Sequence, residues 1–146
     1  AFEKANSLTK VYPNSIIIGS DTLVELNGRI LPKPKTKEEA VQMLLSLSGT
    51  NHQIHTGYAL IDTQTSQQNS GVQTSIVTLR KISLEEAKNY VEHEDVLGVA
   101  GAYDHEHLGG IFVENLDGEF YGSIGLPLFA IAKSLKEIFG IDVLTV

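Results

Sequence analysis

The spacing of apolar residues predicts strands and helices that alternate along the chain. Ile16-Ile17-Ile18 is a short β-branched run without polar alternation, which is typical of a strand buried on both faces. Asn27-Gly28 separates two short apolar runs, and this dipeptide predicts a hairpin over residues 23–31. Further strands are predicted over residues 53–61, 72–79 and 111–113, with a polar loop over 62–71 and a turn at 117–118.

Capping residues and amphipathic spacing predict the helices between these strands. Thr36 with Glu39, and Ser83 with Glu86, have the spacing of capping boxes. The predicted helices are the end of a helix within residues 1–10, a helix from 36 to 49, one from 83 to about 93, and one from 125 to 140. We therefore expect an α/β fold, a mixed β-sheet with flanking helices, in a single domain over residues 1–146.

Composition narrows the class of protein. A chain of 146 residues with 42% hydrophobic content is large enough to bury a core and is not typical of disorder. It has no cysteine, which excludes a disulfide scaffold, a cysteine zinc site and thiol catalysis. No apolar run approaches the roughly 20 residues of a membrane span, and residues 1–10 do not resemble a signal peptide. We expect a cytoplasmic protein without a membrane partner.

The charge balance argues against nucleic-acid polymers as partners. Eleven basic and eighteen acidic residues give a net charge of −7, and the basic residues are scattered. Binding to DNA or RNA needs clustered lysine and arginine side chains that displace counterions. A small anionic ligand remains compatible with this chain if a few cations or a metal ion are placed locally.

Two short segments carry candidate chemistry. Ser20-Asp21-Thr22 follows the apolar run, where the end of a central strand would deliver a carboxylate that binds a metal or activates water. A turn-capping aspartate is the equally simple alternative. Lys33 lies between Pro32 and Pro34, whose rigid backbone suits a cation directed at phosphate. Taken alone, this pattern is also typical of a solvated lysine in a loop.

The histidines suggest a different reading. Residues 104–107 (Asp-His-Glu-His) and 93–95 (His-Glu-Asp) contain residue types that bind zinc or manganese, so a small metal-binding module is one alternative. Against it, a histidine at a helix C-terminus is ordinary. His52 and His55 are three residues apart on a predicted strand, so they face opposite sides and are more simply explained as residues at the rim of the core.

Several short stretches, in order and across nearly the whole chain, carry a family resemblance. The matching stretches are residues 18–22, 33–36, 38–40, 47–49, 56–57, 100–103 and 125–128. Together they resemble the Maf family of nucleoside triphosphate pyrophosphatases, relatives of the inosine triphosphatase fold. Members usually begin with a further strand and a Ser-Pro-Arg-rich loop that contacts phosphate, so we expect this chain to lack its N-terminal portion.

The resemblance implies a reaction and its residues. It implies hydrolysis of a nucleoside triphosphate to the monophosphate and pyrophosphate, with a divalent cation, Mg²⁺ or Mn²⁺. Asp21 matches the family's proton acceptor, and Lys33 matches the lysine of its Gly-Lys-Pro motif, although Pro32 replaces the glycine. Asp21 and Glu106 are the expected metal ligands.

The resemblance also implies residues that bind and select the nucleotide. Thr22 and Glu106 match positions tied to substrate choice, and we assign Ser20 and Thr56 to substrate binding as well. For Glu106, a contact with a purine edge or a cationic methylated ring is slightly preferred to metal binding, because the family ties this position to substrate choice.

Two branches of the family differ near Glu106. The branch acting on dTTP and UTP has a lysine before Ala-Gly-Ala-Tyr and then a glutamine, whereas the branch acting on 7-methylguanosine triphosphate has a glutamate. Val99 and Glu106 resemble the second branch. Thr22 argues for the first, and His107 replaces a glycine present in both.

A catalytically weak domain that binds nucleotide or protein is the main alternative to an enzyme. Family members are linked to septum formation, so a regulatory role is one such reading. Because the phosphate loop is expected to be absent, a homodimer in which a second copy completes the site is another expectation.

Overall fold

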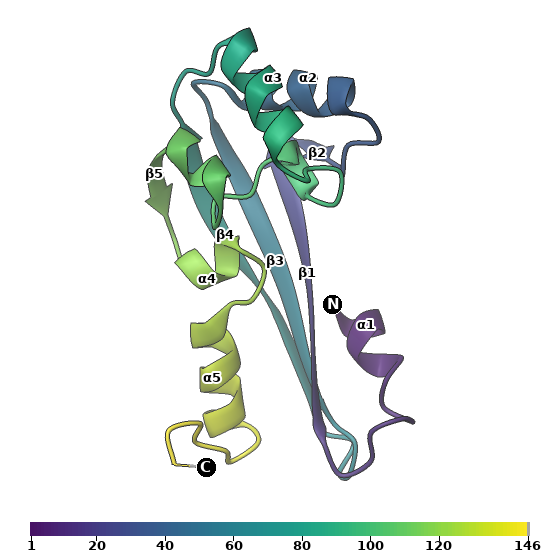
Figure 1. Ribbon diagram of the computed structural model, residues 1–146. Helices are drawn as coiled ribbons and strands as arrows, with labels where there is room; N and C mark the ends of the chain where they lie inside the picture. Colours follow the sequence, from purple (N-terminus) through teal and green to yellow (C-terminus); the bar gives the residue numbers. More distant parts are fainter. Residues whose placement is uncertain (146) are drawn as a thin grey trace. The chain divides into compact units, whose positions relative to one another are not determined.

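The structure is a computed structural model that describes residues 1–145 (Figure 1). A five-stranded sheet has the order β2-β1-β3-β4-β5. The helices and strands are α1 (Phe2–Asn6), β1 (Ile16–Leu26), β2 (Arg29–Leu31), α2 (Lys37–Leu47), β3 (Asn51–Asp62), β4 (Gln68–Leu79), α3 (Leu84–His93), the 3₁₀ helices η1 (Ala100–Ala102) and η2 (Leu108–Phe112), β5 (Val113–Asp117), α4 (Phe120–Ser123) and α5 (Leu128–Glu137).

Contacts divide the chain into two compact units. The first, which we call the α1–α5 unit, comprises residues 1–22, 56–74 and the chain from Glu119 onward. The second, the α2–α3 unit, comprises residues 23–55 and 75–118. Strands β1, β3 and β4 contribute residues to both units.

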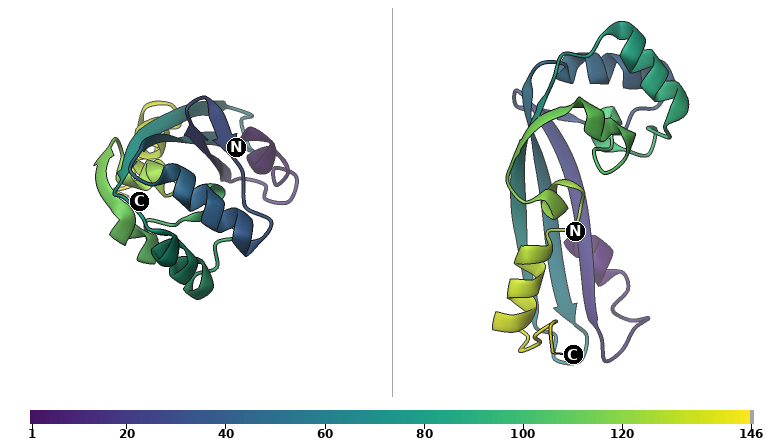
Figure 2. Two further views of the ribbon diagram at one scale, coloured as in Figure 1. Left: turned by 90° about the horizontal axis from the view of Figure 1, so that it is seen from above. Right: turned by 60° about the vertical axis from the view of Figure 1, so that its left-hand side comes forward.

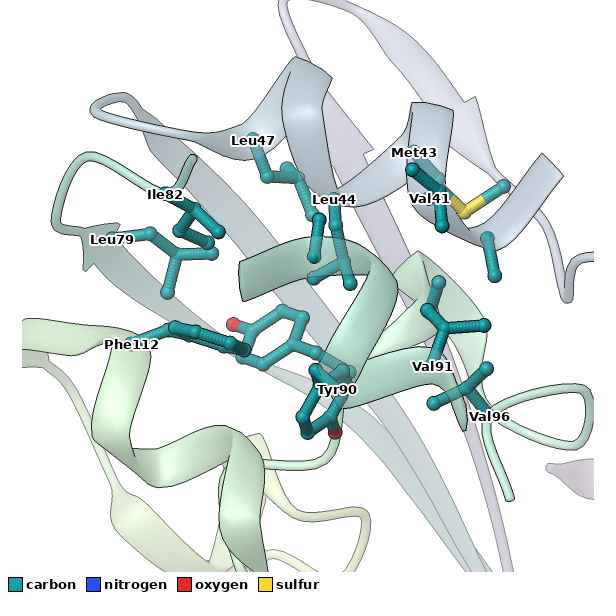
Figure 3. Packing of buried hydrophobic residues seen from close by; sticks show 14 of the residues in the cluster. Val41, Met43, Leu44, Leu47, Leu79, Ile82, Tyr90, Val91, Val96 and Phe112 are labelled. Carbon is teal, nitrogen blue, oxygen red and sulfur yellow. The ribbon is translucent and has the colours of Figure 1, made fainter. Parts of the chain in front are cut away.

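The α2–α3 unit is built around large apolar side chains. Leu44 and Leu47 from α2 and Leu79 from β4 have no exposed surface, and Phe112 is 1% exposed. The ring of Tyr90 on α3 meets Phe112 edge to face at 5.1 Å between centroids (Figure 3). Each fully buried side chain of this kind contributes about 1.5–3 kcal/mol of transfer free energy, so this core holds the unit together.

The predicted caps of α2 and α3 are both present, but only one is a complete box. In α3, Ser83 Oγ accepts from Glu86 N, and the Glu86 carboxylate accepts from Ser83 N. This bond, together with Arg80, lowers the pKa of Glu86 to about 2. In α2, Thr36 Oγ1 accepts from Glu39 N, but the Glu39 carboxylate accepts from Lys35 N at 2.8 Å, so the expected reciprocal bond to Thr36 N is not formed.

The strands of the α1–α5 unit are covered on both faces. Along β3, Ala59 packs with Ala5 of α1, whereas its neighbour Leu60 packs with Ile131 and Leu135 of α5. Successive strand residues point to opposite faces, so α1 and α5 lie on opposite sides of these strands, as Figure 2 also shows. Three consecutive β3 residues, 59–61, are therefore buried without polar alternation.

The expectation for Ile16-Ile17-Ile18 is partly wrong. Ile17 is buried against Ala5, and Ile16 packs with the α5 cluster, but Ile18 is 42% exposed. The strand also does not end at residues 19–22, because β1 continues through them to Leu26. A run of β-branched residues indicates a strand, but it does not show where a covering helix stops.

Other strand boundaries also shift. The hairpin over residues 23–31 is confirmed, with antiparallel pairing of Val24 to Leu31 and positive φ at Asn27 and Gly28. Strand β4 begins at Gln68, so residues 68–71 of the predicted polar loop are extended backbone. Residues 111–112 belong to η2, and the predicted strand there begins only at Val113.

The α/β class with helices flanking the sheet is confirmed. The pairings of β1 with β2 and of β4 with β5 are antiparallel. In the part of the chain that the structure describes, no helix combines the length and the apolar character that crossing a bilayer requires.

Candidate active site

The α1–α5 unit places Ser20-Asp21-Thr22 in the middle of β1, where side chains alternate between the two faces. Asp21 contacts α1, whereas Ser20 and Thr22 contact the opposite side, near Gly125. The sequence predicted that these residues lie at the end of the strand. The structure instead separates the carboxylate from the two hydroxyl groups, because they are neighbours on a continuing strand rather than in a loop.

A lysine from α1 holds Asp21. Lys4 Nζ lies 2.5 Å from Asp21 Oδ1 and also donates to the carbonyl of Ser20 at 3.3 Å. The side chains of Lys4 and Asp21 are 62% and 52% exposed, so the pair is open to solvent and to a ligand. The exposed carboxylate can reach a water molecule here, and the adjacent ammonium group balances its negative charge.

A glycine lets α1 come this close to β1. A Cβ atom at Gly19 would lie 2.6 Å from the carbonyl oxygen of Ala1 and 2.8 Å from the amide nitrogen of Ala5. Any side chain at residue 19 would therefore push the helix away from the strand. Lys4 reaches Asp21 because helix and strand touch backbone to backbone at this point.

The hydroxyl groups on the other side of β1 bind one another and the backbone. Ser20 Oγ lies 2.6 Å from the carbonyl oxygen of Gly125 and 3.1 Å from that of Gly57, and its single proton serves one of them at a time. Thr22 Oγ1 and Thr56 Oγ1 are 2.9 Å apart, and Thr56 is completely buried. These contacts attach β1 to β3 and to the turn before α5.

Gly125 has a positive φ of 110°, and a Cβ there would lie 3.4 Å from Thr22 Oγ1. A glycine is therefore required for both the turn and the close approach. The helix predicted from residue 125 to 140 is present but shorter, since α5 spans Leu128–Glu137.

The α2–α3 unit contains the other predicted site residues, Lys33 and Glu106. Lys33 is exposed between exposed Pro32 and buried Pro34, after β2 and before α2. Among residues 1–145, no hydrogen bond or ion pair engages its ammonium group. It can therefore bind an anion without first breaking a contact in the protein.

Glu106 is exposed in the short loop between η1 and η2. Its backbone N–H donates to Asp104 Oδ1 at 2.9 Å. Asp104 Oδ2 lies 2.9 Å from His107 Nδ1, and this contact raises the pKa of His107. Burial lowers the pKa of His105. The loop is thus organised by its own side chains.

The two strand histidines differ in burial. His52 is 2% exposed, and its Nε2 lies 2.7 Å from the hydroxyl oxygen of Tyr103. Burial, with a smaller effect of nearby His105, lowers the pKa of His52 to about 4. His55 Nε2 lies 3.3 Å from Glu25 Oε2. These contacts agree with the interpretation of both residues as part of the core and its rim.

The histidine-rich segments do not form a metal cage. The structure contains, over residues 1–145, no group of three or more histidine, cysteine, aspartate or glutamate side chains that could hold a metal ion. His107 is instead paired with Asp104, and His93 Nδ1 lies 2.7 Å from the carbonyl oxygen of Asn89. The alternative of a metal-binding module using residues 104–107 therefore finds no support.

Sequence reasoning missed Lys4, and it considered Asp104 only as a candidate metal ligand. Each acts on a site residue through a contact that spacing along the chain does not show, since Lys4 is 17 residues from Asp21. The only available signal for Lys4 was its place beside Ala5 on a helix with one small-residue face. For Asp104, the signal was an aspartate two residues before Glu106, the spacing of a side-chain-to-backbone turn.

Comparison with known proteins gives one family. A family model described as "Maf-like protein" matches residues 1–138. The dTTP/UTP pyrophosphatase of Alkaliphilus oremlandii is 37% identical over 145 residues, which cover 99% of this chain and 75% of the relative. The proteins of the same name from Clostridium novyi and Methanosarcina barkeri are each 37% identical, over 94% and 92% of this chain and 70% and 68% of their own length.

Proposed function

This chain belongs to the Maf family, and we propose that it hydrolyses a nucleoside triphosphate to the monophosphate and pyrophosphate, with Asp21 as the general base. The observation that carries the assignment is the half-exposed Asp21 carboxylate, fixed on β1 by Lys4. A base must be accessible to water and held in one direction, and this pair supplies both conditions.

In the proposed reaction, the Asp21 carboxylate accepts a proton from a water molecule. The water oxygen forms a bond to the α phosphorus as the anhydride bond between the α and β phosphates breaks. Pyrophosphate leaves with the bonding electron pair. Lys4 keeps the carboxylate oriented and balances its charge, so that an anionic substrate meets less repulsion at this point.

Charge on the triphosphate must be balanced before water can attack it. We assign Lys33 to phosphate binding, because it is exposed, framed by prolines and unengaged among the described residues. A lysine binds phosphate as a point charge.

A divalent metal fits the residues present. Carboxylate oxygens are the donors that Mg²⁺ and Mn²⁺ prefer, and Mg²⁺ is usually held by one or two carboxylates plus phosphate oxygens rather than by a protein cage. We propose Asp21 as a protein ligand of the metal and Glu106 as a second one, a role that ranks below the contact of Glu106 with the nucleotide. When bound, the metal would neutralise phosphate charge.

We propose that Ser20, Thr22 and Thr56 contribute to substrate binding from the face of β1 opposite to Asp21. Thr22 is the member of this group that is tied to nucleotide choice by resemblance. Thr56 is fully buried, so its contribution passes through its contact with Thr22 Oγ1 rather than through the nucleotide itself. Ser20 fixes the turn at Gly125 beside Thr22.

For the substrate, we propose 7-methylguanosine triphosphate, selected by Glu106. An exposed carboxylate at the loop tip can accept hydrogen bonds from a purine edge or pair with a cationic methylated ring. A second candidate has support of its own: three relatives at 37% identity are named for dTTP and UTP, and Thr22 also favours that choice.

We expect the enzyme to act in the cytoplasm on a free nucleotide. A net charge of −7 gives no general attraction to nucleic-acid polymers. A homodimer is part of the proposal and is tested by measuring the mass of the protein in solution. Light scattering that gives only the monomer mass of 15.9 kDa would remove it.

The proposed function is tested with a panel of triphosphates. Pyrophosphate and nucleoside monophosphate are quantified for 7-methylguanosine triphosphate, dTTP, UTP and GTP, each with Mg²⁺, with Mn²⁺ and with a chelator. The expected result is equal release of both products, dependent on the metal and largest for 7-methylguanosine triphosphate. Highest activity with dTTP or UTP would transfer the assignment to the second candidate. No release from any triphosphate would contradict the enzyme and favour the nucleotide- or partner-binding regulatory domain.

A further inference from the structure

The loop that carries Glu106 is attached to the core at its first residue. Tyr103 is 3% exposed, and its hydroxyl oxygen lies 2.7 Å from Nε2 of buried His52 on β3. The two rings meet edge to face, with centroids 5.5 Å apart. The backbone therefore leaves the core at Tyr103 from a fixed point and in a fixed direction.

The next residue is held from α3. The backbone N–H of Asp104 donates to the hydroxyl oxygen of Tyr90 at 3.1 Å. Tyr90 itself is 3% exposed and packs against Phe112 (Figure 3). At the other end of the loop, a Cβ at Gly109 would lie 2.8 Å from the same Tyr90 oxygen. The loop is thus pressed against α3 at both ends.

The side chain of Asp104 then turns back over the loop. One carboxylate oxygen, Oδ1, accepts from Glu106 N, and the other, Oδ2, lies 2.9 Å from His107 Nδ1. The Asp104 side chain is 33% exposed and that of His107 is 66% exposed. One carboxylate therefore binds the backbone of Glu106 and the side chain of the residue after it.

We propose that Asp104 is a positioning residue that sets the direction of Glu106 and thereby the nucleotide preference of the enzyme. The inference rests on the proposed function, because it assumes that Glu106 selects the substrate. A flexible loop would have to be ordered when nucleotide binds, which weakens binding. The Asp104 carboxylate orders residues 104–107 during folding. Glu106 therefore contacts the nucleobase in one conformation.

Two variants separate positioning from simple stabilisation. Asp104→Ala removes both contacts of the carboxylate. Asp104→Asn keeps an amide oxygen that accepts from Glu106 N, and loses only the charge opposite His107. The matched control, His107→Gly, removes the histidine contact alone, because the bond from Asp104 to Glu106 N does not involve His107.

The experiment measures kcat and KM of each variant for 7-methylguanosine triphosphate and dTTP. In Asp104→Ala, we expect the kcat/KM ratio between the two nucleotides to fall roughly tenfold, mainly through KM for the preferred nucleotide, as expected for one lost selective contact. In Asp104→Asn and His107→Gly, the ratio should stay within about threefold of wild type, because Glu106 N can still be bound. In a Glu106→Gln background, Asp104→Ala should not change the ratio further.

Other results would overturn the inference. If Asp104→Ala lowers kcat/KM equally for both nucleotides, or leaves both unchanged, Asp104 does not position Glu106. If Asp104→Asn lowers the kcat/KM ratio as much as Asp104→Ala does, the hydrogen bond from Glu106 N to residue 104 does not set the nucleotide preference. These outcomes leave the proposed function standing, because the wild-type chain remains active. A wild-type chain that hydrolyses no triphosphate overturns both the proposed function and the positioning role of Asp104.

Discussion

The two units of this protein are packed in different ways, and each way suits a different task. In the α2–α3 unit, leucine, valine and aromatic side chains fill a large core, and a short loop with Glu106 is attached to that core through Tyr90 and Tyr103. In the α1–α5 unit, α1 lies directly on the strands through Gly19 and Ala5, with almost no side chain in between.

The difference shows how packing places chemistry. Close contact between backbones brings a charged side chain of one element to a carboxylate of another, as Lys4 reaches Asp21. A large core instead fixes the base of a loop whose tip stays exposed. We infer that Asp21 in the α1–α5 unit supplies the proton acceptor, and that Glu106 in the α2–α3 unit contributes to nucleotide selection together with Thr22.

The largest effect is expected for Asp21→Asn, which removes the proposed base from the α1–α5 unit. The amide cannot accept a proton at neutral pH, so kcat should fall by at least about 100-fold, the usual contribution of a general base. Because the Asp21 side chain is 52% exposed, the thermal unfolding midpoint should change little. Steady-state pyrophosphate release measures kcat, and calorimetry measures the thermal unfolding midpoint. Turnover at the wild-type rate would remove Asp21 as the base.

The core of the α2–α3 unit should show a pH dependence that originates at His52. Its pKa is about 4 in the folded protein and near 6.5 in an unfolded chain, so the unfolded state binds more protons between these values. Stability is therefore complete above pH 6.5 and falls as the pH is lowered toward 4, by up to about 3 kcal/mol.

The measurement is urea unfolding of wild type and His52→Gln between pH 6.5 and 4. Glutamine keeps a polar atom for the Tyr103 hydroxyl but does not titrate. The wild type should lose up to about 3 kcal/mol more than the variant over this range. Parallel curves for the two proteins would show that His52 is not buried in its neutral form.

A smaller effect is expected where α1 touches β1. Gly19→Ala places a methyl group against backbone atoms of Ala1 and Ala5, which should cost about 1–3 kcal/mol and displace Lys4 from Asp21. The control is Gly57→Ala, in the same unit, where the nearest atom would be the Ala1 Cβ at an ordinary 3.6 Å. Chemical unfolding and activity are measured for both. Equal losses in the two variants would contradict the close contact at Gly19.

The smallest effect on stability is expected for Lys4→Met. The pair with Asp21 is exposed on both sides, so the free energy of unfolding should change by less than about 1 kcal/mol. Activity should nevertheless fall several-fold, and Lys4→Arg should restore much of it, because a cation again faces the carboxylate. If methionine and arginine give equal activity, the charge at residue 4 plays no part in the reaction.

Local signals predicted much of the fold, and contacts distant in sequence explain the errors. The cap at Ser83 and the Asn27-Gly28 turn depend on a few adjacent residues, and the structure confirms them. The burial of Ile18 and the start of β4 depend instead on how far α5 and the neighbouring strands extend. No pattern within those segments contains that information.

For the candidate site too, local motifs were predictive and contacts distant in sequence were not. The Maf resemblance and the pyrophosphatase class are confirmed, since short motifs in order specify a family. The roles of Asp21, Lys33 and Glu106 stay predictions. The contacts of Lys4 and Asp104 were missed because each supports a site residue through three-dimensional proximity or a turn, while its own residue type is common on protein surfaces.

The separate roles proposed for Asp21 and Glu106 are tested most directly by one crossed measurement. The value of kcat/KM is determined for wild type, Asp21→Asn and Glu106→Gln, each with 7-methylguanosine triphosphate and dTTP. Asp21→Asn should lower both values by the same factor, whereas Glu106→Gln should change their ratio roughly tenfold or more and leave at least one nucleotide readily hydrolysed. An unchanged ratio in Glu106→Gln, or a changed ratio in Asp21→Asn, would contradict the assignment of proton transfer to Asp21 and of nucleotide selection to Glu106.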